Sequence, residues 1–494
     1  MDKLDVFDEV MHRAHQGGGK EKVDMQHNLK KLTARERILS ILDNGSFIEV
    51  GGLIKKNGSG VIAGHGTING RLVYIYAEDY TVDGATFNRF AAEKICNIMD
   101  KAAQCGAPII KVFDSIGGNI SQGVELLSSY GKVLRKTSKL NGVIPQISVV
   151  AGPCNGIMAA NATLSDFIVV IEGLSKLSIN TNDSLRVAES NYIDNKLFNS
   201  EESIKSGNAN FVVKTEEEAL NITRKILEFI PSNSLEMAPL SCEDNSLNDK
   251  KDNLNKAAID ETFNGELVVN TIADEGSTLE VNKNLESAIK TYLIKLNGLT
   301  VGVIANGNEK SKLDRKLSTK VCRFVRICDS FNIPILSIVD TLGFEASLKE
   351  EINGVASDVG TMIYALCDST VPKVSLVIGE AYGAGYLSLA SKESALDVSL
   401  AWPTAKIALT NPKNQIKNKY IDEIINAENK EAKEAELIKE HINEYADPYL
   451  AAEVGLIDSI IKPSETKQMV FAMLDMLQSK RELSYPKKHG KNLL

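Results

Sequence analysis

The chain repeats itself at a nearly constant spacing, and this feature constrains its fold more than any other. Asn69-Gly70 recurs as Asn297-Gly298, and each pair is followed by an apolar run. Further matches follow in the same order: Lys94 with Lys320, Pro108 with Pro334, Asp114 with Asp340, Pro145 with Pro372, and Gly152 with Gly379. All six offsets lie between 226 and 228 residues. Because ordered matches at one spacing are hard to obtain by chance, the pattern predicts a tandem duplication.

Each half alternates short apolar strands with amphipathic helices. In the first half the pattern predicts strands at 72–77, 109–114 and 146–150 and helices at 88–104 and 124–138. In the second half it predicts strands at 299–305, 335–340 and 374–378 and a helix at 320–330. Continuous runs of Val and Ile between helices are typical of sheets that are covered on both faces. The fold class is therefore predicted to be α/β.

The 494 residues provide enough chain for two large domains. We expect one domain over residues 1–230 and the other over 265–494. Residues 231–264 are rich in Ser, Asn, Asp and Lys and carry little apolar periodicity, so they are predicted to form the linker.

Composition excludes several classes of function. The net charge is -9, with 56 Lys and Arg against 65 Asp and Glu, so nucleic acid is not expected as a partner. Seven cysteines without a CxxC pair, and histidines without ligand spacing, give no sign of a metal site. No stretch approaches the roughly 20 apolar residues of a membrane span, and residues 1–20 lack the apolar region of a signal peptide. We therefore expect a soluble, cytoplasmic protein.

Glycine-containing loops follow the predicted strands at matching points of both halves. They cover residues 114–118 and 152–157 in the first half and 340–344 and 379–386 in the second. A turn of this kind that leads into a helix leaves backbone N–H groups unpaired, and these can hold a developing oxyanion. The glycines could instead serve only tight turns. Their repetition in both halves favours the interpretation as two oxyanion sites.

Several motifs resemble those of the biotin-dependent acyl-CoA carboxyltransferases, which include the β subunit of propionyl-CoA carboxylase and the α subunit of methylmalonyl-CoA decarboxylase. The sequence KLTARERI at 31–38, followed by LDNGSF at 42–47, resembles the opening signature of that family. The resemblance continues in the family's order through GHG at 64–66, AEKI at 92–95, VIPQIS at 143–148, GPC at 152–154, CDSFNIP at 328–334, AWPTA at 401–405, DPYLAAE at 447–453 and PKKHG at 486–490. It covers nearly the whole chain.

The resemblance implies a tandem pair of crotonase-like (ClpP-like) ββα-spiral domains. The N-terminal half would bind the acyl-CoA, and the C-terminal half would bind biotin that a separate carrier protein supplies. The site in this family uses both halves, is usually completed across a dimer inside a hexamer, and needs no metal. The reaction would move CO2 between N1 of biotin and the α-carbon of a short acyl-CoA, such as propionyl-CoA or methylmalonyl-CoA.

This chemistry explains why two oxyanion sites would be needed. Proton removal from the thioester puts negative charge on its oxygen, and loss of CO2 from carboxybiotin puts charge on the ureido oxygen. The resemblance implies that Gly156 and Ile157 hold the thioester oxygen and that Ala384 and Gly385 hold the biotin oxygen. The biotin nitrogen itself can take the proton, so no separate base is needed.

Four further residues are predicted to contact substrate: Gly117 and Gly118 in the first loop, and Tyr386 and Leu387 after the last one. The resemblance places Tyr386 and Leu387 where the family shapes its acyl pocket, and an apolar Leu387 suits a short alkyl group. The competing interpretation is that these two side chains simply belong to the core.

The chain also departs from the family pattern. Ile116 and Ile157 stand where the family has glycine, and a β-branched residue such as Ile116 resists a positive φ. These changes leave an alternative open, namely a weakened paralogue that serves as a structural or regulatory subunit. The chain lacks a Met-Lys-Met type biotin attachment segment and a GxxxxGK[ST] loop. The expected partners are therefore a biotin carboxyl carrier protein and either a biotin carboxylase or a membrane decarboxylase subunit.

Overall fold

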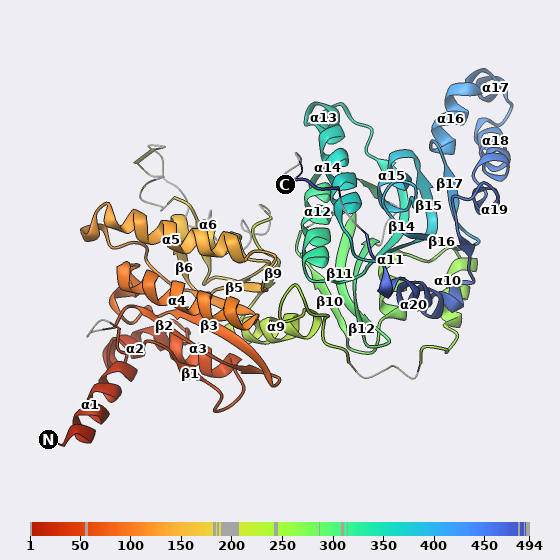
Figure 1. Cartoon of the computed structure of the whole chain (residues 1–494). Coiled ribbons are helices and arrows are strands. Elements are labelled where there is room, and N and C mark those ends of the chain that lie inside the picture. Colours follow the sequence, from red (N-terminus) through yellow and green to blue (C-terminus); the bar gives the residue numbers. More distant parts are fainter. Residues whose placement is uncertain are drawn as a thin grey trace. The chain divides into compact units, whose positions relative to one another are not determined.

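The computed structural model describes residues 2–54, 58–180, 184, 187–188, 207–241, 246–285, 287–307, 311–313, 315–482, 485–488 and 490. The chain divides into two compact units, Met1–Met237 and Ala238–Leu494, here called the N-terminal and C-terminal units (Figure 1). The division falls within the segment 231–264 that the composition predicts as a linker.

The main sheet of the N-terminal unit has the strand order β1-β2-β3-β4-β5-β7-β9 among the described residues. The strands β1, β2 and β3 pair antiparallel, and all later neighbours pair parallel. The bounds are β1 (Ile48–Glu49), β2 (Val61–Ile68), β3 (Arg71–Glu78), β4 (Ile109–Phe113), β5 (Gln146–Val150), β7 (Phe167–Ile171) and β9 (Phe211–Val213). A separate parallel pair, β6 (Pro153–Asn155) and β8 (Lys176–Ser178), follows the end of β5.

The C-terminal unit repeats this plan with the order β10-β11-β12-β14-β15-β16-β18. Its strands are β10 (Thr278–Val281), β11 (Ile289–Leu296), β12 (Leu299–Asn306), β14 (Ile335–Phe344), β15 (Lys373–Tyr382), β16 (Val398–Ala401) and β18 (Ser459–Ile460). Two short strands lie beside this path, β13 (Ser311–Leu313) on β14 and β17 (Lys406–Ala408) on β15. The first three strands are again antiparallel and the rest parallel, so the tandem duplication and the α/β class are confirmed.

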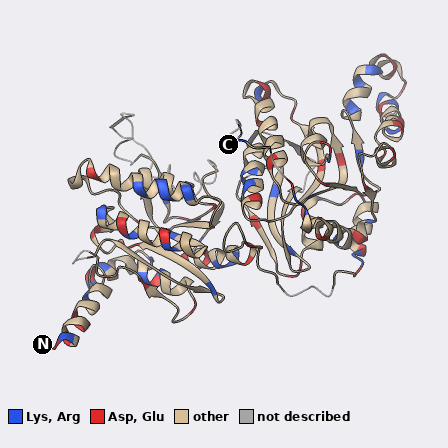
Figure 2. Cartoon of the chain, viewed as in Figure 1, with Lys and Arg blue, Asp and Glu red and all other residues tan. Residues whose placement is uncertain are grey.

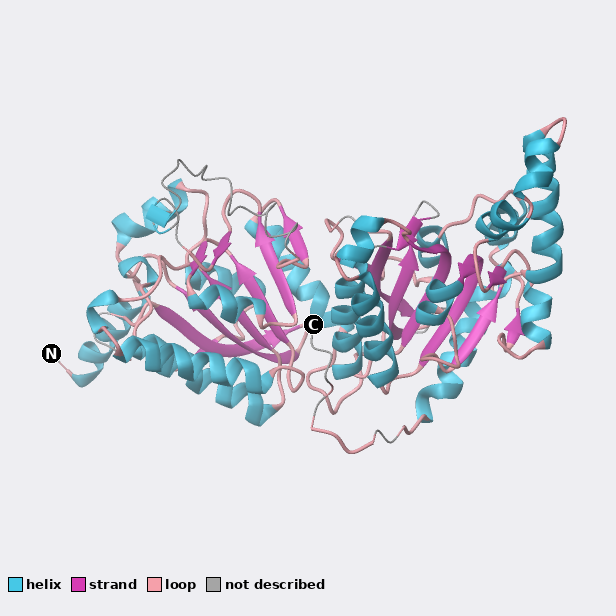
Figure 3. Cartoon of the chain, turned by 90° about the horizontal axis from the view of Figure 1, so that it is seen from above, coloured by secondary structure: helices cyan, strands magenta, loops and turns pink. Residues whose placement is uncertain are grey.

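Helices cover both faces of each sheet (Figure 3). The helices of the N-terminal unit are α1 (Lys3–His15), α2 (Lys20–Asn28), α3 (Ala34–Ile41), α4 (Arg89–Cys105), α5 (Glu125–Leu140), α6 (Ile157–Thr163) and α9 (Glu216–Phe229). The apolar face of α4, with Ile95, Ile98 and Met99, packs into one core with Tyr74 and Tyr76 of β3. This packing explains the helical spacing of apolar residues in the sequence.

Among the described residues, the C-terminal unit shows more helices. They are α10 (Asp252–Ile259), α11 (Gly265–Ile272), α12 (Arg315–Ser330), α13 (Leu348–Ile352), α14 (Val355–Asp368), α15 (Gly383–Leu389), α16 (Pro412–Lys419), α17 (Ile421–Asn426), α18 (Lys430–Tyr445), α19 (Pro448–Glu453) and α20 (Thr466–Met476). Helix α10 lies within 231–264, yet its Leu254 and Ala258 are buried in the core of this unit. Their i, i+4 spacing gives α10 one apolar face, which the polar composition of the segment conceals.

The repeated Asn-Gly pairs form equivalent turns. The backbone N–H groups of Asn69 and Gly70 donate to the carboxylate of Asp43 at 3.0 and 2.9 Å, and those of Asn297 and Gly298 donate to Asp274 at 3.0 and 2.8 Å. Both asparagines have positive φ, as a tight hairpin turn requires. The amide of Gly70 and the hydroxyl of Thr67 hold the pKa of Asp43 well below its usual range. The first repeated motif is therefore a pair of capped hairpin turns.

Lys and Arg are interspersed with Asp and Glu over the helices of both units (Figure 2). Within the ranges that the structure describes, no helix is both long and apolar enough to cross a membrane.

Candidate functional site

The loop after β4 is fixed at almost every backbone amide. The N–H groups of residues 114–117 and 119 all donate hydrogen bonds, at 2.8–3.1 Å, to Glu78 Oε2, Pro153 O, Gly84 O, Ser115 Oγ and Phe87 O respectively. The N–H of Gly118 has no acceptor among the described residues. An otherwise saturated loop therefore presents one free amide.

A side chain at Gly118 would press on the tips of two neighbouring side chains. A β-carbon at this position would lie 2.6 Å from Tyr130 Oη and 2.7 Å from Leu126 Cδ2. The ring of Tyr130 is itself held by stacking on Phe87, with the ring centroids 4.3 Å apart. The neighbouring Gly117 has φ 124°, a conformation that favours glycine.

Ile116 does not strain this loop. Positive φ falls on Gly117, whereas Ile116 is not among the residues with positive φ. The β-branched residue that replaces the family's glycine therefore adopts a conformation open to any side chain.

The turn after β5 lies at the same edge of the sheet, because β4 and β5 are neighbouring parallel strands. The N–H of Ser115 donates to Pro153 O at 2.8 Å and so joins the two loops directly. Gly156 stands before α6 with φ 69°, and its N–H donates to Ser178 O at 3.0 Å. Ile157 is the first residue of α6, so its N–H precedes the hydrogen bonds of the helix. The structure thus leaves the amide of Ile157 free, among the described residues, and engages that of Gly156.

The corresponding turn of the C-terminal unit starts α15. Ala384 is exposed and Gly385 is buried, and both precede the first i→i−4 hydrogen bond of the helix. A β-carbon at Gly385 would lie 3.1 Å from Gly343 Cα and 3.1 Å from Thr341 Cγ2. The start of α15 is therefore packed directly against Gly343, which lies near the end of β14 and not in the loop that the sequence pattern predicted over residues 340–344.

Tyr386 and Leu387 differ in what they offer to a ligand. The side chain of Tyr386 is 6% exposed, its hydroxyl donates to Leu456 O at 3.3 Å, and burial raises its pKa to about 12. Leu387 is 48% exposed. Tyr386 therefore anchors α15 within its own unit, and of these two residues only Leu387 presents its side chain to a ligand.

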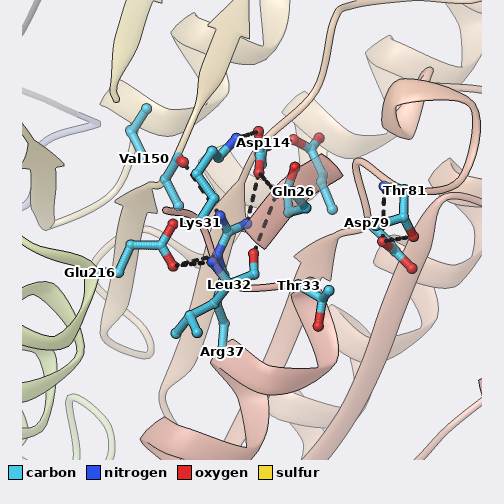
Figure 4. A network of polar contacts seen from close by, with 12 residues as sticks. Gln26, Lys31, Leu32, Thr33, Arg37, Asp79, Thr81, Asp114, Val150 and Glu216 are labelled. Atoms are coloured by element: carbon cyan, nitrogen blue, oxygen red, sulfur yellow. Dashed lines mark hydrogen bonds and ion pairs between the residues drawn. The ribbon is translucent and has the colours of Figure 1, made fainter. Parts of the chain in front are cut away.

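A buried group of charges lies beneath the loop at Asp114 (Figure 4). Asp114 accepts from Lys31 Nζ at 2.6 Å, Arg37 Nη1 at 2.9 Å and Gln26 Nε2 at 3.0 Å. Arg37 also binds Glu216 through two hydrogen bonds, of 2.7 and 3.1 Å. The sequence pattern recognised Lys31 and Arg37 only as parts of a motif, because their partners lie far along the chain.

Two of the repeated residues, an aspartate and a glycine, contact each other in each unit. A β-carbon at Gly152 would lie 1.9 Å from Asp114 Oδ1, and one at Gly379 would lie 2.3 Å from Asp340 Oδ1. Neither distance is compatible with a side chain. In the N-terminal unit these residues follow β4 and β5, and in the C-terminal unit they lie within β14 and β15. In both units the aspartate fills the space beside the glycine of the neighbouring parallel segment.

Within the parts of the chain that the structure describes, no three His, Cys, Asp or Glu side chains are placed to hold a metal ion.

Comparisons with known proteins bear on the whole chain. Residues 25–492 match the family model described as carboxyl transferase domain. The carboxyltransferase subunit of propionyl-CoA carboxylase from Haloferax mediterranei is 36% identical over 508 residues, which cover 99% of this chain and 98% of that protein. Subunit alpha of methylmalonyl-CoA decarboxylase from Veillonella parvula is 35% identical over 514 residues, with 99% and 98% covered.

The fold is that of a solved relative. The crystal structure of transcarboxylase 12S, described as a hexamer with methylmalonyl-coenzyme A bound, superposes with a TM-score of 0.91 at 32% identity and covers 99% of this chain and 97% of its own. This likeness confirms the tandem pair of crotonase-like domains. The chain therefore belongs to the carboxyl transferase family, the biotin-dependent acyl-CoA carboxyltransferases that its motifs resemble.

Proposed function

We propose that the chain is the carboxyltransferase subunit that moves CO2 between carboxybiotin and the α-carbon of a short acyl-CoA, propionyl-CoA or methylmalonyl-CoA. The observation that carries the proposal is the pair of free amides, Gly118 and Ile157, on two joined loops at one sheet edge. The relatives support the same reaction, since they are named as subunits of a propionyl-CoA carboxylase and a methylmalonyl-CoA decarboxylase.

On the acyl-CoA side, the thioester oxygen becomes negative when the α-carbon loses a proton or CO2. The amides of Gly118 and Ile157 would donate to that oxygen, and each such donor is worth about 3 kcal/mol in a transition state. Gly156 contributes differently from the sequence-based expectation. Its N–H is engaged with Ser178, so its role is to turn the chain into α6 at a positive φ. Gly117 positions Gly118 in the same way.

On the biotin side, the ureido oxygen becomes negative when carboxybiotin releases CO2. The amides of Ala384 and Gly385 at the start of α15 would hold that oxygen. Leu387 would contact the alkyl group of the acyl-CoA, because its side chain is apolar and exposed. Tyr386 would hold the turn in place through its buried side chain, whose hydroxyl donates to Leu456 O. The freed nitrogen of biotin takes the proton from the α-carbon, so the reaction needs no separate base.

The proposal includes partners. Biotin would arrive on a biotin carboxyl carrier protein, and a biotin carboxylase or a membrane decarboxylase subunit would load or unload it. Transcarboxylase 12S forms a hexamer, and we propose the same assembly here, in the cytoplasm. We propose that the reaction uses no metal.

The geometry favours an active enzyme over a merely structural paralogue, because Ile116 adopts an ordinary φ and Ile157 keeps a free amide.

The test uses the purified chain with free biotin in place of the carrier. Malonyl-CoA or methylmalonyl-CoA should lose CO2 and yield acetyl-CoA or propionyl-CoA, as measured by chromatography of the acyl-CoA. Because carboxybiotin is the intermediate, the reaction should stop when avidin sequesters the biotin. An assembled hexamer that shows no biotin-dependent turnover would contradict the proposal and favour a structural or regulatory subunit.

A further inference from the structure

The charges beneath the loop at Asp114 join the two loops that carry the proposed acyl-CoA donors. Asp114 begins the loop that ends in Gly118, and Gly152 begins the turn that ends in Ile157. The Lys31–Asp114 ion pair lies directly over Gly152, because a β-carbon there would be 1.9 Å from Asp114 Oδ1 and 2.8 Å from Lys31 Nζ. The position of this ion pair therefore sets the spacing of both loops.

Arg37 ties the same aspartate to a third segment. It donates to Asp114 Oδ2 at 2.9 Å and to both carboxylate oxygens of Glu216, which begins α9. Glu216 also accepts from the backbone N–H of Leu32 at 3.1 Å. The segment 31–37 is thus fastened at both ends and holds Asp114 from one side (Figure 4).

All four charged side chains of the group are buried. Removing charges from water costs several kcal/mol per ion, so a buried ion pair adds little net stability, and apolar replacements are often equally stable. Such a group does constrain geometry, since a bidentate Arg–carboxylate pair fixes the direction as well as the distance between its two side chains. The group is therefore better suited to positioning than to stabilisation.

The C-terminal unit shows that the shared backbone does not require a lysine at this place. There the ring of Phe263 meets the equivalent glycine, with its Cε2 atom 3.0 Å from a β-carbon built on Gly379. Phe263 packs in turn on Trp402, with ring centroids 5.8 Å apart. The glycine of this contact is thus flanked by an aromatic ring in one unit and by a lysine in the other.

We infer that Lys31 and Arg37 are positioning residues of the acyl-CoA side. They hold Asp114, and through it they fix the distance between the amides of Gly118 and Ile157. The inference rests on the proposed function, because it assigns these two residues to the donors proposed above. It predicts that loss of the Lys31 charge lowers turnover without weakening the use of biotin.

The experiment compares Lys31→Met with Lys31→Arg and with Lys94→Met. Lys94 is a matched control because it is equally buried in the same unit and is paired with Glu49 at 3.4 Å, away from both loops. In the biotin-dependent decarboxylation assay, Lys31→Met should lower kcat about 10- to 100-fold, since small misplacements of catalytic groups have effects of this size. The KM for free biotin should stay unchanged. Lys31→Arg should restore most of kcat, and Lys94→Met should keep it.

A second readout does not depend on activity. Hydrogen exchange at residues 114–119 and 152–157 should be faster in Lys31→Met than in wild type, and unchanged in Lys94→Met. If Lys31→Met does not fold, Gln26→Met serves instead, because Gln26 gives Asp114 a neutral hydrogen bond of 3.0 Å. A wild-type enzyme without biotin-dependent turnover would refute the proposed function alone, and exchange would still decide the inference. Wild-type kcat and exchange in Lys31→Met, or an equal fall of kcat in Lys94→Met, would overturn the inference.

Discussion

Glu78 and Asn306 end equivalent strands of the two units, and each accepts a hydrogen bond from the backbone amide of an aspartate, Asp114 directly after β4 or Asp340 within β14. The distance from the Asp114 N–H to Glu78 Oε2 is 2.9 Å, and that from the Asp340 N–H to Asn306 Oδ1 is 2.8 Å. The other polar atom of each side chain, Glu78 Oε1 or Asn306 Nδ2, is buried without a partner among the described residues. Burial raises the pKa of Glu78 to about 8, so both halves use a neutral side chain at neutral pH.

We expect Glu78→Gln to gain stability over wild type as pH rises. The pKa of Glu78 in the folded chain lies above the value of 4.5 for a free side chain. Between these two values the folded chain retains a proton that the unfolded chain has lost, so the wild-type free energy of unfolding falls with pH by up to about 1.4 kcal/mol per unit. The glutamine variant lacks this dependence. Denaturant titrations at pH 5, 6.5 and 8 should therefore give free energies of unfolding for wild type and Glu78→Gln that diverge by a few kcal/mol as pH rises.

Asn306→Asp provides the reciprocal control. It places an acid at the equivalent buried position of the C-terminal unit, and it should make stability fall with rising pH. A stability difference between wild type and Glu78→Gln that is the same at all three pH values would contradict this account of Glu78.

We expect Ile157→Pro to abolish most of the turnover while leaving the fold intact. Proline lacks the N–H but is well tolerated at the first residue of a helix, which is the position of Ile157 in α6. Loss of one oxyanion donor lowers kcat about 100- to 1,000-fold. Ile157→Ala keeps the amide and removes the same side chain, so it should stay within a few-fold of wild type. Equal kcat in the two variants would show that the amide donates to no reacting oxygen.

We expect Ala384→Pro to weaken the biotin half of the reaction. Ala384 lies in the first turn of α15, where proline is again accepted, and its N–H is one of the two proposed donors to the ureido oxygen. The rate of biotin-dependent decarboxylation should fall by about 100-fold or more. Acyl-CoA affinity, measured by calorimetry, should stay unchanged, and Ala384→Ser should behave as wild type. A proline variant with normal turnover would exclude this amide from the mechanism.

The sequence pattern predicted several strands whose two faces are buried, but it missed the equally buried β7 and β16. The predicted strand 146–150 coincides with β5, whose residues are all buried. The predicted strand 335–340 continues to Phe344 in β14, because Thr341 pairs with both β13 and β15. Such pairing is long-range and leaves no local signal. Strand β2 was not predicted, because Gly64 and Gly66 interrupt its apolar pattern. Glycine stands at position 64 because a β-carbon there would lie 2.2 Å from Ile48 O.

The site shows the same limit. Repetition of glycine loops located the turns at Gly156 and Gly385, but it could not tell which amide is free. That depends on Ser178 of β8, some twenty residues later in the chain, whose carbonyl oxygen accepts a hydrogen bond from the N–H of Gly156. Lys31 and Arg37 stood in a recognised motif, yet their partner Asp114 becomes visible only in three dimensions. Local pattern identifies the turn, and long-range hydrogen bonding shows which of its amides is left free.

We expect Gly118→Ala to disrupt the acyl-CoA side through contact rather than through backbone strain. The new methyl group would lie 2.6 Å from Tyr130 Oη and 2.7 Å from Leu126 Cδ2, so it would push on these side chains and on the loop that carries the free amide. Turnover should fall at least about 10-fold. Tyr130→Phe removes the nearer atom, and the double variant should recover part of kcat, because only the Leu126 contact remains. Gly131→Ala in the same helix α5 meets no atom within 4 Å and should be neutral or stabilising by about 1 kcal/mol. Independent, additive effects of the Gly118 and Tyr130 changes would show that this contact does not set the position of the loop.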